Sequence, residues 1–313
     1  MTDCIGSSMT LKKRRMQTRP HTKKVGWCGL GAMGSVMAPH LLAVTDNLIG
    51  YDVNPNVWQT AQFNPDLKRA KQLTDLAQTD TLITMLPDGP AVQSVCETVL
   101  SAGFSGTIID MSSCHPQDSL SLADDITAEG SCFIDAPVSG GVAKAASAEL
   151  MIMAGGKDDD IRGVQILLTA MGNLQHVGPV GAGHVMKALN NYVSAAGLLA
   201  SFQALATAKD AGISPKTFIK VINSSTGRNN TTEVKLEKFV LPETFNSGFA
   251  LQLMAKDVNI ARELIEVAGY TTPVTPALAT CLDSAVSALG QWADHTALYS
   301  YVTDKLNAEG LDK

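Results

Sequence analysis

The sequence lacks the features that mark membrane, secreted and zinc-binding proteins. No apolar run approaches the roughly 20 residues that a membrane-spanning helix needs, and the polar N-terminus has no hydrophobic core of a secretory signal. The six cysteines form no C-x-x-C pair and have no regular spacing, so neither a disulfide framework nor a zinc site is expected. We therefore expect a soluble cytoplasmic protein with reduced thiols.

An excess of positive charge is also missing, because the formal net charge is -6 at pH 7. This balance predicts neither nucleic acid nor an anionic membrane as a partner, and a small anionic substrate would need local positive groups. The six histidines show no metal-ligand spacing. The acidic runs Asp124-Asp125 and Asp158 to Asp160 are interpreted as solvated helix caps, so no metal is predicted.

Residues 1–24 stand apart, with seven Lys and Arg residues and a single acid, Asp3. Such basic segments are usually disordered, so we exclude this extension from the fold. An over-long start, with Met9 and Met16 as internal alternatives, is favoured over a nucleic-acid-binding tail or an organelle-targeting peptide. A targeting peptide would place the protein in the mitochondrial matrix.

The chain of 313 residues is long enough for two domains, and its pattern changes near residue 180. Short apolar segments alternate with helix-like stretches before this point, which predicts a mostly parallel, doubly wound sheet. The expected strands are residues 25–28, 48–52, 81–86, 107–111, 132–135 and 150–154. We predict an α/β protein with an N-terminal Rossmann domain at residues 25–180.

The second half of the chain predicts helices alone. Residues 183–211 contain no proline and one internal glycine, and their apolar residues recur at helical intervals, which indicates a long helix. Further helical segments follow, and no strand-like alternation appears after Val180. We expect an all-helical domain for substrate binding and oligomerisation at residues 181–313, in a homodimer or homotetramer.

A glycine-rich turn follows the first expected strand, with the pattern G-x-G-x-x-G in Gly29-Leu30-Gly31-Ala32-Met33-Gly34. In this pattern the glycines permit a tight turn, close approach of a pyrophosphate, and close packing of helix on strand. Asp52 ends the second expected strand, where a carboxylate can bind both ribose hydroxyls and repel a 2′-phosphate. The sequence thus predicts NAD, with NADP possible; the alternative is a structural turn beside a solvated Asp52.

Two later segments suggest a substrate site. Ser139-Gly140-Gly141 follows an expected strand, and its consecutive backbone N–H groups can form an anion-binding nest, although a simple strand-to-helix turn is equally compatible. Lys187 and Asn191 are four residues apart on the expected long helix and share one face. An ammonium in an apolar cleft tends to have a lowered pKa, which suits Lys187 to take a proton from a hydroxyl while Asn191 orients that hydroxyl.

With these segments the chain resembles the β-hydroxyacid dehydrogenase family, typified by 3-hydroxyisobutyrate dehydrogenase and tartronate semialdehyde reductase. Four motifs match in order over residues 25 to about 300: the glycine turn with Met37-Ala38, residues 135–150, residues 181–191, and Lys256-Asp257 within residues 249–261.

The resemblance also implies roles for individual residues. It makes Lys187 the catalytic lysine, assigns substrate positioning to Asn191, and gives Ser139, Gly140 and Gly141 the substrate carboxylate. Lys256, Leu86, Pro87 and Ser113 would contact the cofactor. His40, Lys144, Ala148 and Glu149 depart from the family pattern beside the motifs, which affects the choice of substrate.

These observations predict an oxidoreductase that transfers a hydride between NAD and a small 3-hydroxy carboxylate or its semialdehyde. The nearest alternative is an NADPH-dependent reductase of tartronate semialdehyde, succinic semialdehyde or glyoxylate. An alternative of another class is a non-catalytic dinucleotide-binding scaffold, since a relative in this family has lost the lysine. The presence of Lys187 and Asn191 argues against the scaffold.

Overall fold

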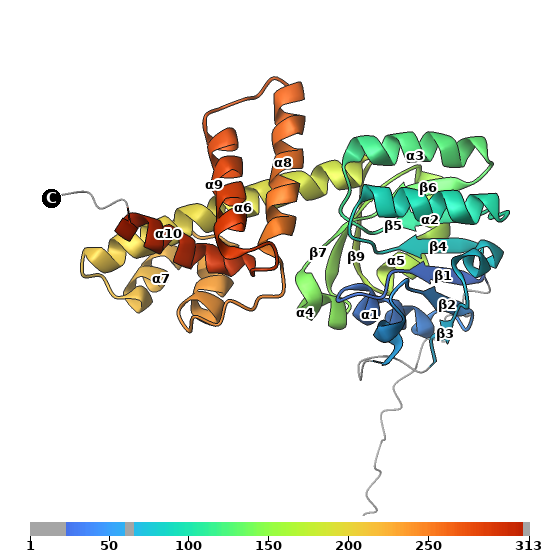
Figure 1. Cartoon of the computed structure of the whole chain (residues 1–313), viewed down its shortest axis with the longest axis horizontal. Coiled ribbons are helices and arrows are strands. Elements are labelled where there is room, and N and C mark those ends of the chain that lie inside the picture. Colours follow the sequence, from blue (N-terminus) through green and yellow to red (C-terminus); the bar gives the residue numbers. More distant parts are fainter. Residues whose placement is uncertain (1–22, 60–65, 309–313) are drawn as a thin grey trace, which may run out of the picture.

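The computed structural model of this chain describes residues 23–59 and 66–308. Most of the predicted basic extension therefore lies outside the described residues. Among the helices that are described, none combines the length and apolar character needed to cross a membrane. The chain forms a sheet-containing part and a helical part, and the long helix α6 (Ala182–Asp210) runs from one into the other (Figure 1).

The sheet has the strand order β3-β2-β1-β4-β5-β6-β8-β7, with β9 paired to β8. Strands β1 to β6 run parallel, because the chain returns to the same end of the sheet through a crossover connection before each new strand. The strands are β1 (Val25–Cys28), β2 (Leu48–Tyr51), β3 (Lys68–Arg69), β4 (Thr81–Thr84), β5 (Thr107–Asp110), β6 (Cys132–Asp135), β7 (Val138–Ser139), β8 (Leu150–Gly155) and β9 (Gly172–Gly178).

All six expected strands are confirmed with shifts of no more than two residues at their ends, but three strands were not anticipated. The strand β3 has only two residues, β7 is equally short, and β9 is largely polar and lies at the edge of the sheet. Neither short length nor polar composition produces the apolar pattern by which a strand is recognised. In addition, β8 pairs antiparallel with β6 and β7, so the last part of the sheet departs from the parallel arrangement.

Helices cover the sheet, but the expected helix after the glycine turn is short. It consists of α1 (Gly34–Met37) followed by the 3₁₀ helix η1 (Ala38–Ala43), because Pro39 has no N–H to donate to a longer helix. The other helices of this part are the 3₁₀ helices η2 (Pro55–Gln59) and η3 (Leu73–Gln78), with α2 (Gly89–Ser101), α3 (Pro116–Ala128), α4 (Gly141–Ala146) and α5 (Asp158–Thr169). The acids Asp158 to Asp160 occupy the first turn of α5, as expected, whereas Asp124-Asp125 lie exposed within α3 rather than at its cap.

The helical part is built around α6. This helix confirms the one predicted at residues 183–211, with each end shifted by one residue. Buried side chains such as Phe202, Leu236, Met254 and Leu282 form its core. The remaining elements are α7 (Pro215–Asn223), the π-helix η4 (Thr231–Val240), α8 (Leu251–Val267), α9 (Val274–Leu289), the 3₁₀ helix η5 (His295–Ala297) and α10 (Leu298–Ala308).

The two parts are joined by the carboxylate of Asp135 at the end of β6. Its Oδ1 accepts a hydrogen bond from Gly181 N at 2.7 Å, and its Oδ2 accepts one from His184 N at 2.9 Å. These N–H groups belong to the first turn of α6, which has no partners for them within the helix. Asp135 therefore fixes where α6 begins and in which direction it leaves the sheet.

This bond arrangement carries an electrostatic cost. Asp135 is fully buried, and burial raises its pKa from the ordinary 3.8 to about 6, although the charge of His184 and the backbone N–H groups oppose the shift. A carboxyl group whose pKa is raised in the folded state contributes stability at low pH, and that contribution is lost as the pH rises through about 6.

We predict that Asp135→Asn removes this pH-dependent contribution. The free energy of unfolding of the wild type, minus that of the variant, should fall by roughly 1–3 kcal/mol between about pH 4 and about pH 7. Denaturant unfolding of both proteins across this range measures the difference. A difference that stays constant or rises with pH would contradict the proposed burial of an ionisable Asp135.

Candidate active site

The glycine turn lies where the strand order reverses, between the carboxyl ends of β1 and β4, which is where open α/β sheets bind ligands. A Cβ at Gly29 would lie 2.2 Å from the Met85 carbonyl oxygen, and one at Gly34 would lie 1.9 Å from the Gly29 carbonyl oxygen. Only glycine fits at these two positions. A Cβ at Gly31 would meet nothing within 4 Å, and Gly31 and Ala32 are exposed, so a ligand can approach this backbone.

Asp52 contacts the turn directly. Its Oδ2 accepts a hydrogen bond from Leu30 N at 2.6 Å, and its Oδ1 accepts one from Asn54 N at 2.8 Å. The carboxylate is partly exposed, which leaves it able to accept further bonds. The open backbone at Gly31 and the adjacent carboxylate fit the diphosphate and ribose of a dinucleotide, and the contact of Asp52 with ribose stays a prediction.

The predicted cofactor-contacting segments come together around Lys256 on α8. Its Nζ donates hydrogen bonds to the Ser113 carbonyl at 2.5 Å and to the Pro87 carbonyl at 3.3 Å. The loop at Leu86 is fixed by a hydrogen bond of 2.9 Å that the Leu86 N–H donates to Ser112 Oγ. Lys256 thus connects the helical part to the loops after β4 and β5.

Asn191 belongs to a buried polar network on the side of α6 that carries Lys187. Asn191 Nδ2 donates to Asp257 Oδ2 at 2.5 Å, and Ser113 Oγ donates to Asp257 Oδ1 at 2.8 Å. Asp257 is 1% exposed, so both bonds lie away from solvent. The network orients the amide of Asn191 and brings a negative charge near Lys187.

The amine of Lys187 has an aromatic neighbour, with its Nζ 6.0 Å from the ring centroid of Phe249. Burial lowers the pKa of Lys187, the charge of Asp257 opposes this shift, and Lys256 adds to it. A lysine in this state can exchange a proton with a neighbouring hydroxyl. The direction of this shift is the one expected from the sequence; the role of Lys187 in the reaction stays a prediction.

Ser139 ends β7, Gly140 follows it, and Gly141 begins α4. Ser139 pairs with Met151 of β8, while Gly140 and Gly141 have φ angles of +144° and +69°. In the described part of the chain no hydrogen bond joins these three residues to Lys187 or Asn191, so their contact with a substrate carboxylate stays a prediction. Lys144 does shape the turn, because a Cβ at Gly140 would lie 2.8 Å from the Lys144 Cβ.

Asp257 and Phe249 lie in a motif that was matched in the sequence, but neither of them was assigned a role from the sequence. Asp257 follows Lys256 in a matched motif, and an acid within an apolar helical stretch is a signal for a buried partner. Phe249 precedes α8 and shows no local pattern that would mark its contact with Lys187.

Comparison with known proteins supports the same parts of the chain. Residues 24–181 match the model of the NAD binding domain of 6-phosphogluconate dehydrogenase, and residues 181–302 match that described as NAD-binding of NADP-dependent 3-hydroxyisobutyrate dehydrogenase. A 2-(hydroxymethyl)glutarate dehydrogenase of Eubacterium barkeri is 34% identical over 277 residues, which are 85% of this chain and 90% of that protein.

Two further relatives are 3-hydroxyisobutyrate dehydrogenases. The mitochondrial enzyme of Mus musculus is 32% identical over 270 residues, covering 83% of this chain and 80% of the mouse protein. A solved structure of the Mycobacterium tuberculosis enzyme with L-serine has a TM-score of 0.81 at 27% identity, covering 90% of this chain and 99% of that one. Fold and sequence therefore agree along nearly the whole described chain.

We predict that Asp257→Asn shifts the pH dependence of oxidation to lower pH. Asp257 is the group that raises the pKa of Lys187, so its neutralisation favours the uncharged amine at a lower pH. The pH profile of kcat/KM measures this shift. Asp283→Asn is the matched control. Asp283 also accepts a hydrogen bond from a side-chain amide, that of Asn259 on α8, but it is exposed. If the acidic limb of the kcat/KM profile stays at the same pH in Asp257→Asn, the proposed effect of Asp257 on the pKa of Lys187 is contradicted.

Proposed function

The chain belongs to the β-hydroxyacid dehydrogenase family, and from this premise we propose that it interconverts a short 3-hydroxy carboxylate and its semialdehyde, with Lys187 as the proton-transfer residue. As a family member it is an NAD(P)-dependent dehydrogenase of hydroxy acids. The observation that carries the lysine role is geometric: Lys187 lies one helical turn before Asn191, whose amide Asp257 holds in place. Burial, which lowers the pKa of Lys187, supports the same role.

In oxidation, the uncharged amine of Lys187 accepts the proton of the substrate hydroxyl, and in reduction its ammonium returns that proton to the carbonyl oxygen. Asn191 orients the hydroxyl through its amide, whose direction is set by Asp257. A bound nicotinamide would accept the hydride from the carbon that bears this hydroxyl, or return it in reduction. Lys187 is then the one residue of this proposed mechanism that changes charge in the reaction.

The glycine turn from Gly29 to Gly34 would hold the cofactor, together with Asp52, the Leu86-Pro87 turn, Ser113 and Lys256. The open backbone at Gly31 and the contact of Lys256 with both loops support this assignment. Asp52 favours NAD, since its charge would repel a 2′-phosphate. The alternative is an NADPH-dependent semialdehyde reductase. A preference for NAD or for NADPH in the assay distinguishes these two functions.

The substrate carries a carboxylate for Ser139, Gly140 and Gly141. Relatives named for 3-hydroxyisobutyrate and for 2-(hydroxymethyl)glutarate support this class, because both molecules have a primary alcohol on the carbon β to a carboxylate. We place the domain boundary at residues 180 and 181, and the start of α6 at Ala182 supports this choice. The exposed apolar side chains of Met186 and Val193 on α6 support a homodimer or homotetramer, here proposed in the cytoplasm.

The proposal is tested with purified protein and a panel of 3-hydroxyisobutyrate, 2-(hydroxymethyl)glutarate, tartronate semialdehyde, succinic semialdehyde and glyoxylate, each with both dinucleotides. We expect turnover of at least one acid with NAD. Lys187→Ala should lower kcat/KM by about 10²-fold or more, since this is the usual contribution of general acid–base catalysis, with cofactor affinity unchanged.

Lys209→Ala is the matched control, because Lys209 lies on the same helix with its Nζ 5.8 Å from the ring centroid of Tyr299, and should retain activity. Absence of turnover with every member of the panel would refute the substrate class. Activity of Lys187→Ala close to that of the control would refute the role of the lysine.

A further inference from the structure

Three buried side chains with metal-binding chemistry meet at the joint between the sheet and α6: Asp110 at the end of β5, Cys114 in the following turn, and His184 in the first turn of α6. We propose that Asp110, Cys114 and His184 form a binding site for a thiophilic divalent cation, best matched by Zn²⁺. The site is separate from Lys187 and the glycine turn. No regular spacing reveals it in the sequence, because two of its residues lie about 70 positions from the third.

The distances between the candidate ligand atoms fit one cation. Asp110 Oδ2 lies 3.4 Å from Cys114 Sγ and 3.7 Å from His184 Nε2, and the ligand atoms of all three residues lie within 4.8 Å of one another. A tetrahedral zinc ion with bonds of about 2.3 Å to sulfur and about 2.0 Å to nitrogen and oxygen separates its ligands by roughly 3.3–3.6 Å. Small side-chain shifts would therefore complete the coordination.

Neighbouring groups hold the ligands in suitable orientations. Asp110 Oδ1 accepts hydrogen bonds from Thr84 Oγ1 at 2.8 Å and from Ser112 N at 3.0 Å, which leaves Oδ2 directed to the cluster. His184 Nδ1 lies 2.7 Å from Ser119 Oγ. His184 Nε2 lies 3.1 Å from the Ser112 carbonyl oxygen, which can only accept, so in the metal-free protein Nε2 carries the proton and Nδ1 accepts from Ser119 Oγ. A cation would take the place of the Nε2 proton, and Nδ1–H would then donate to Ser119 Oγ.

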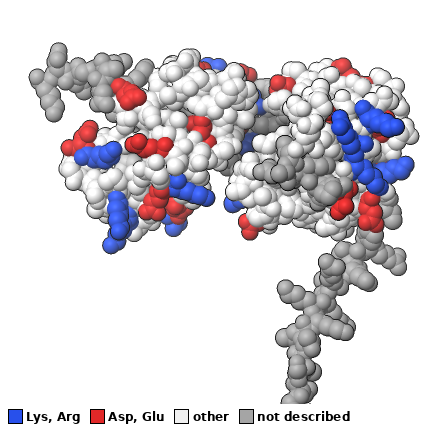
Figure 2. All heavy atoms as spheres, turned by 60° about the horizontal axis from the view of Figure 1, so that its bottom comes forward, with Lys and Arg blue, Asp and Glu red and all other residues white. Residues whose placement is uncertain are grey.

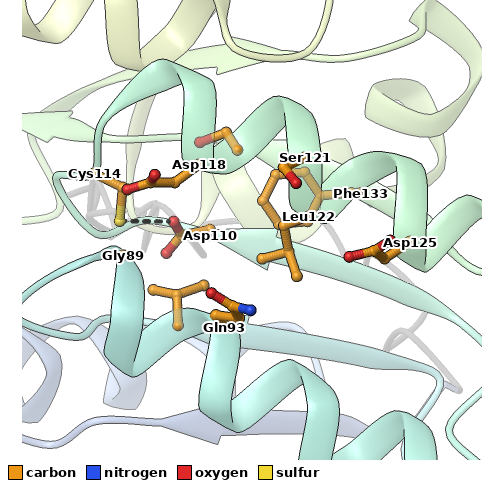
Figure 3. Close-up of a pocket in the computed structure, with 11 residues that line it drawn as sticks. Gly89, Gln93, Asp110, Cys114, Asp118, Ser121, Leu122, Asp125 and Phe133 are labelled. Atoms are coloured by element: carbon orange, nitrogen blue, oxygen red, sulfur yellow. Dashed lines mark hydrogen bonds between the residues drawn. The ribbon is translucent and has the colours of Figure 1, made fainter.

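A cavity beside the cluster provides room for a fourth ligand. It has a volume of about 110 Å³, enough for a metal-bound water, and is lined by Asp110, Cys114 and Ser119 among others. Figure 3 shows Cys114, Asp110 and Asp118 gathered at one end of this cavity and Asp125 at the other. The exposed carboxylates of Asp118 and Asp125 favour the entry of a cation.

The ligand set also indicates which cation is bound. Sulfur, imidazole nitrogen and one carboxylate suit Zn²⁺ or its analogues Co²⁺ and Cd²⁺, whereas Mg²⁺ and Ca²⁺ prefer oxygen ligands. On binding, the Cys114 thiol loses its proton to solvent and forms a metal–sulfur bond, without any change in oxidation state. The cation would link the turn after β5 to α6, three residues before Lys187, and so stabilise the joint.

The experiment uses the full-length protein, freed of metal by a chelator and then titrated with Co²⁺. We expect one Co²⁺ per chain and a thiolate-to-cobalt charge-transfer band in the near ultraviolet. The Cys114→Ser variant keeps a hydroxyl for Asp110 and should lose this band. Cys132→Ser, on the partly exposed thiol of β6, is the control and should retain it.

A second measurement detects a site that forms without a clear absorption band. Zn²⁺ at about 100-fold above its dissociation constant should raise the melting temperature of the wild type and of Cys132→Ser by a few degrees, and should leave Cys114→Ser unchanged. The proposal is overturned if the wild type shows neither the band nor the shift, or if either effect persists in Cys114→Ser.

Discussion

The carboxylate of Asp135 on the first turn of α6 is the constraint on which the site depends. Its two hydrogen bonds, to Gly181 N and His184 N, set the start and direction of a 29-residue helix. Lys187 and Asn191 follow within the next two turns, so their position against the sheet is determined by the same bonds. Burial of the Asp135 carboxylate costs free energy. This unfavourable burial occurs where the core of the sheet part meets the core of the helical part.

A second set of contacts closes the site from the side of α8. Asp257 binds the side chains of Ser113 and Asn191, while Lys256 binds the carbonyl groups of Pro87 and Ser113. One pair of adjacent residues therefore serves both the loops that are expected to contact cofactor and the helix that carries Lys187. The charge that acts on Lys187 is thus held by the same residue that contacts the loop after β5.

The sequence was sufficient for the parts of the fold that follow simple periodicity. The apolar strands and the long helix were located to within two residues at their ends, because strands of a parallel sheet and amphipathic helices have distinct patterns. The polar edge strand β9 and the shortened helix before Pro39 were not foreseen. Lys187, Asn191 and the glycine turn were recognisable as local motifs, whereas the partnership of Asp257 with Ser113 spans 144 positions and the cluster of Asp110, Cys114 and His184 depends on the joint.

The most direct test of this account is the pKa of Lys187 itself. A protein labelled with carbon-13 at the lysine Cε can be titrated by NMR, with the Lys187 signal identified by its loss in Lys187→Arg. The account predicts that Lys187 titrates below the ordinary lysine value of 10.5 and below the exposed lysines of the same protein. Titration of Lys187 together with the exposed lysines would contradict it, because the amine would then lack the buried setting that suits it to transfer a proton.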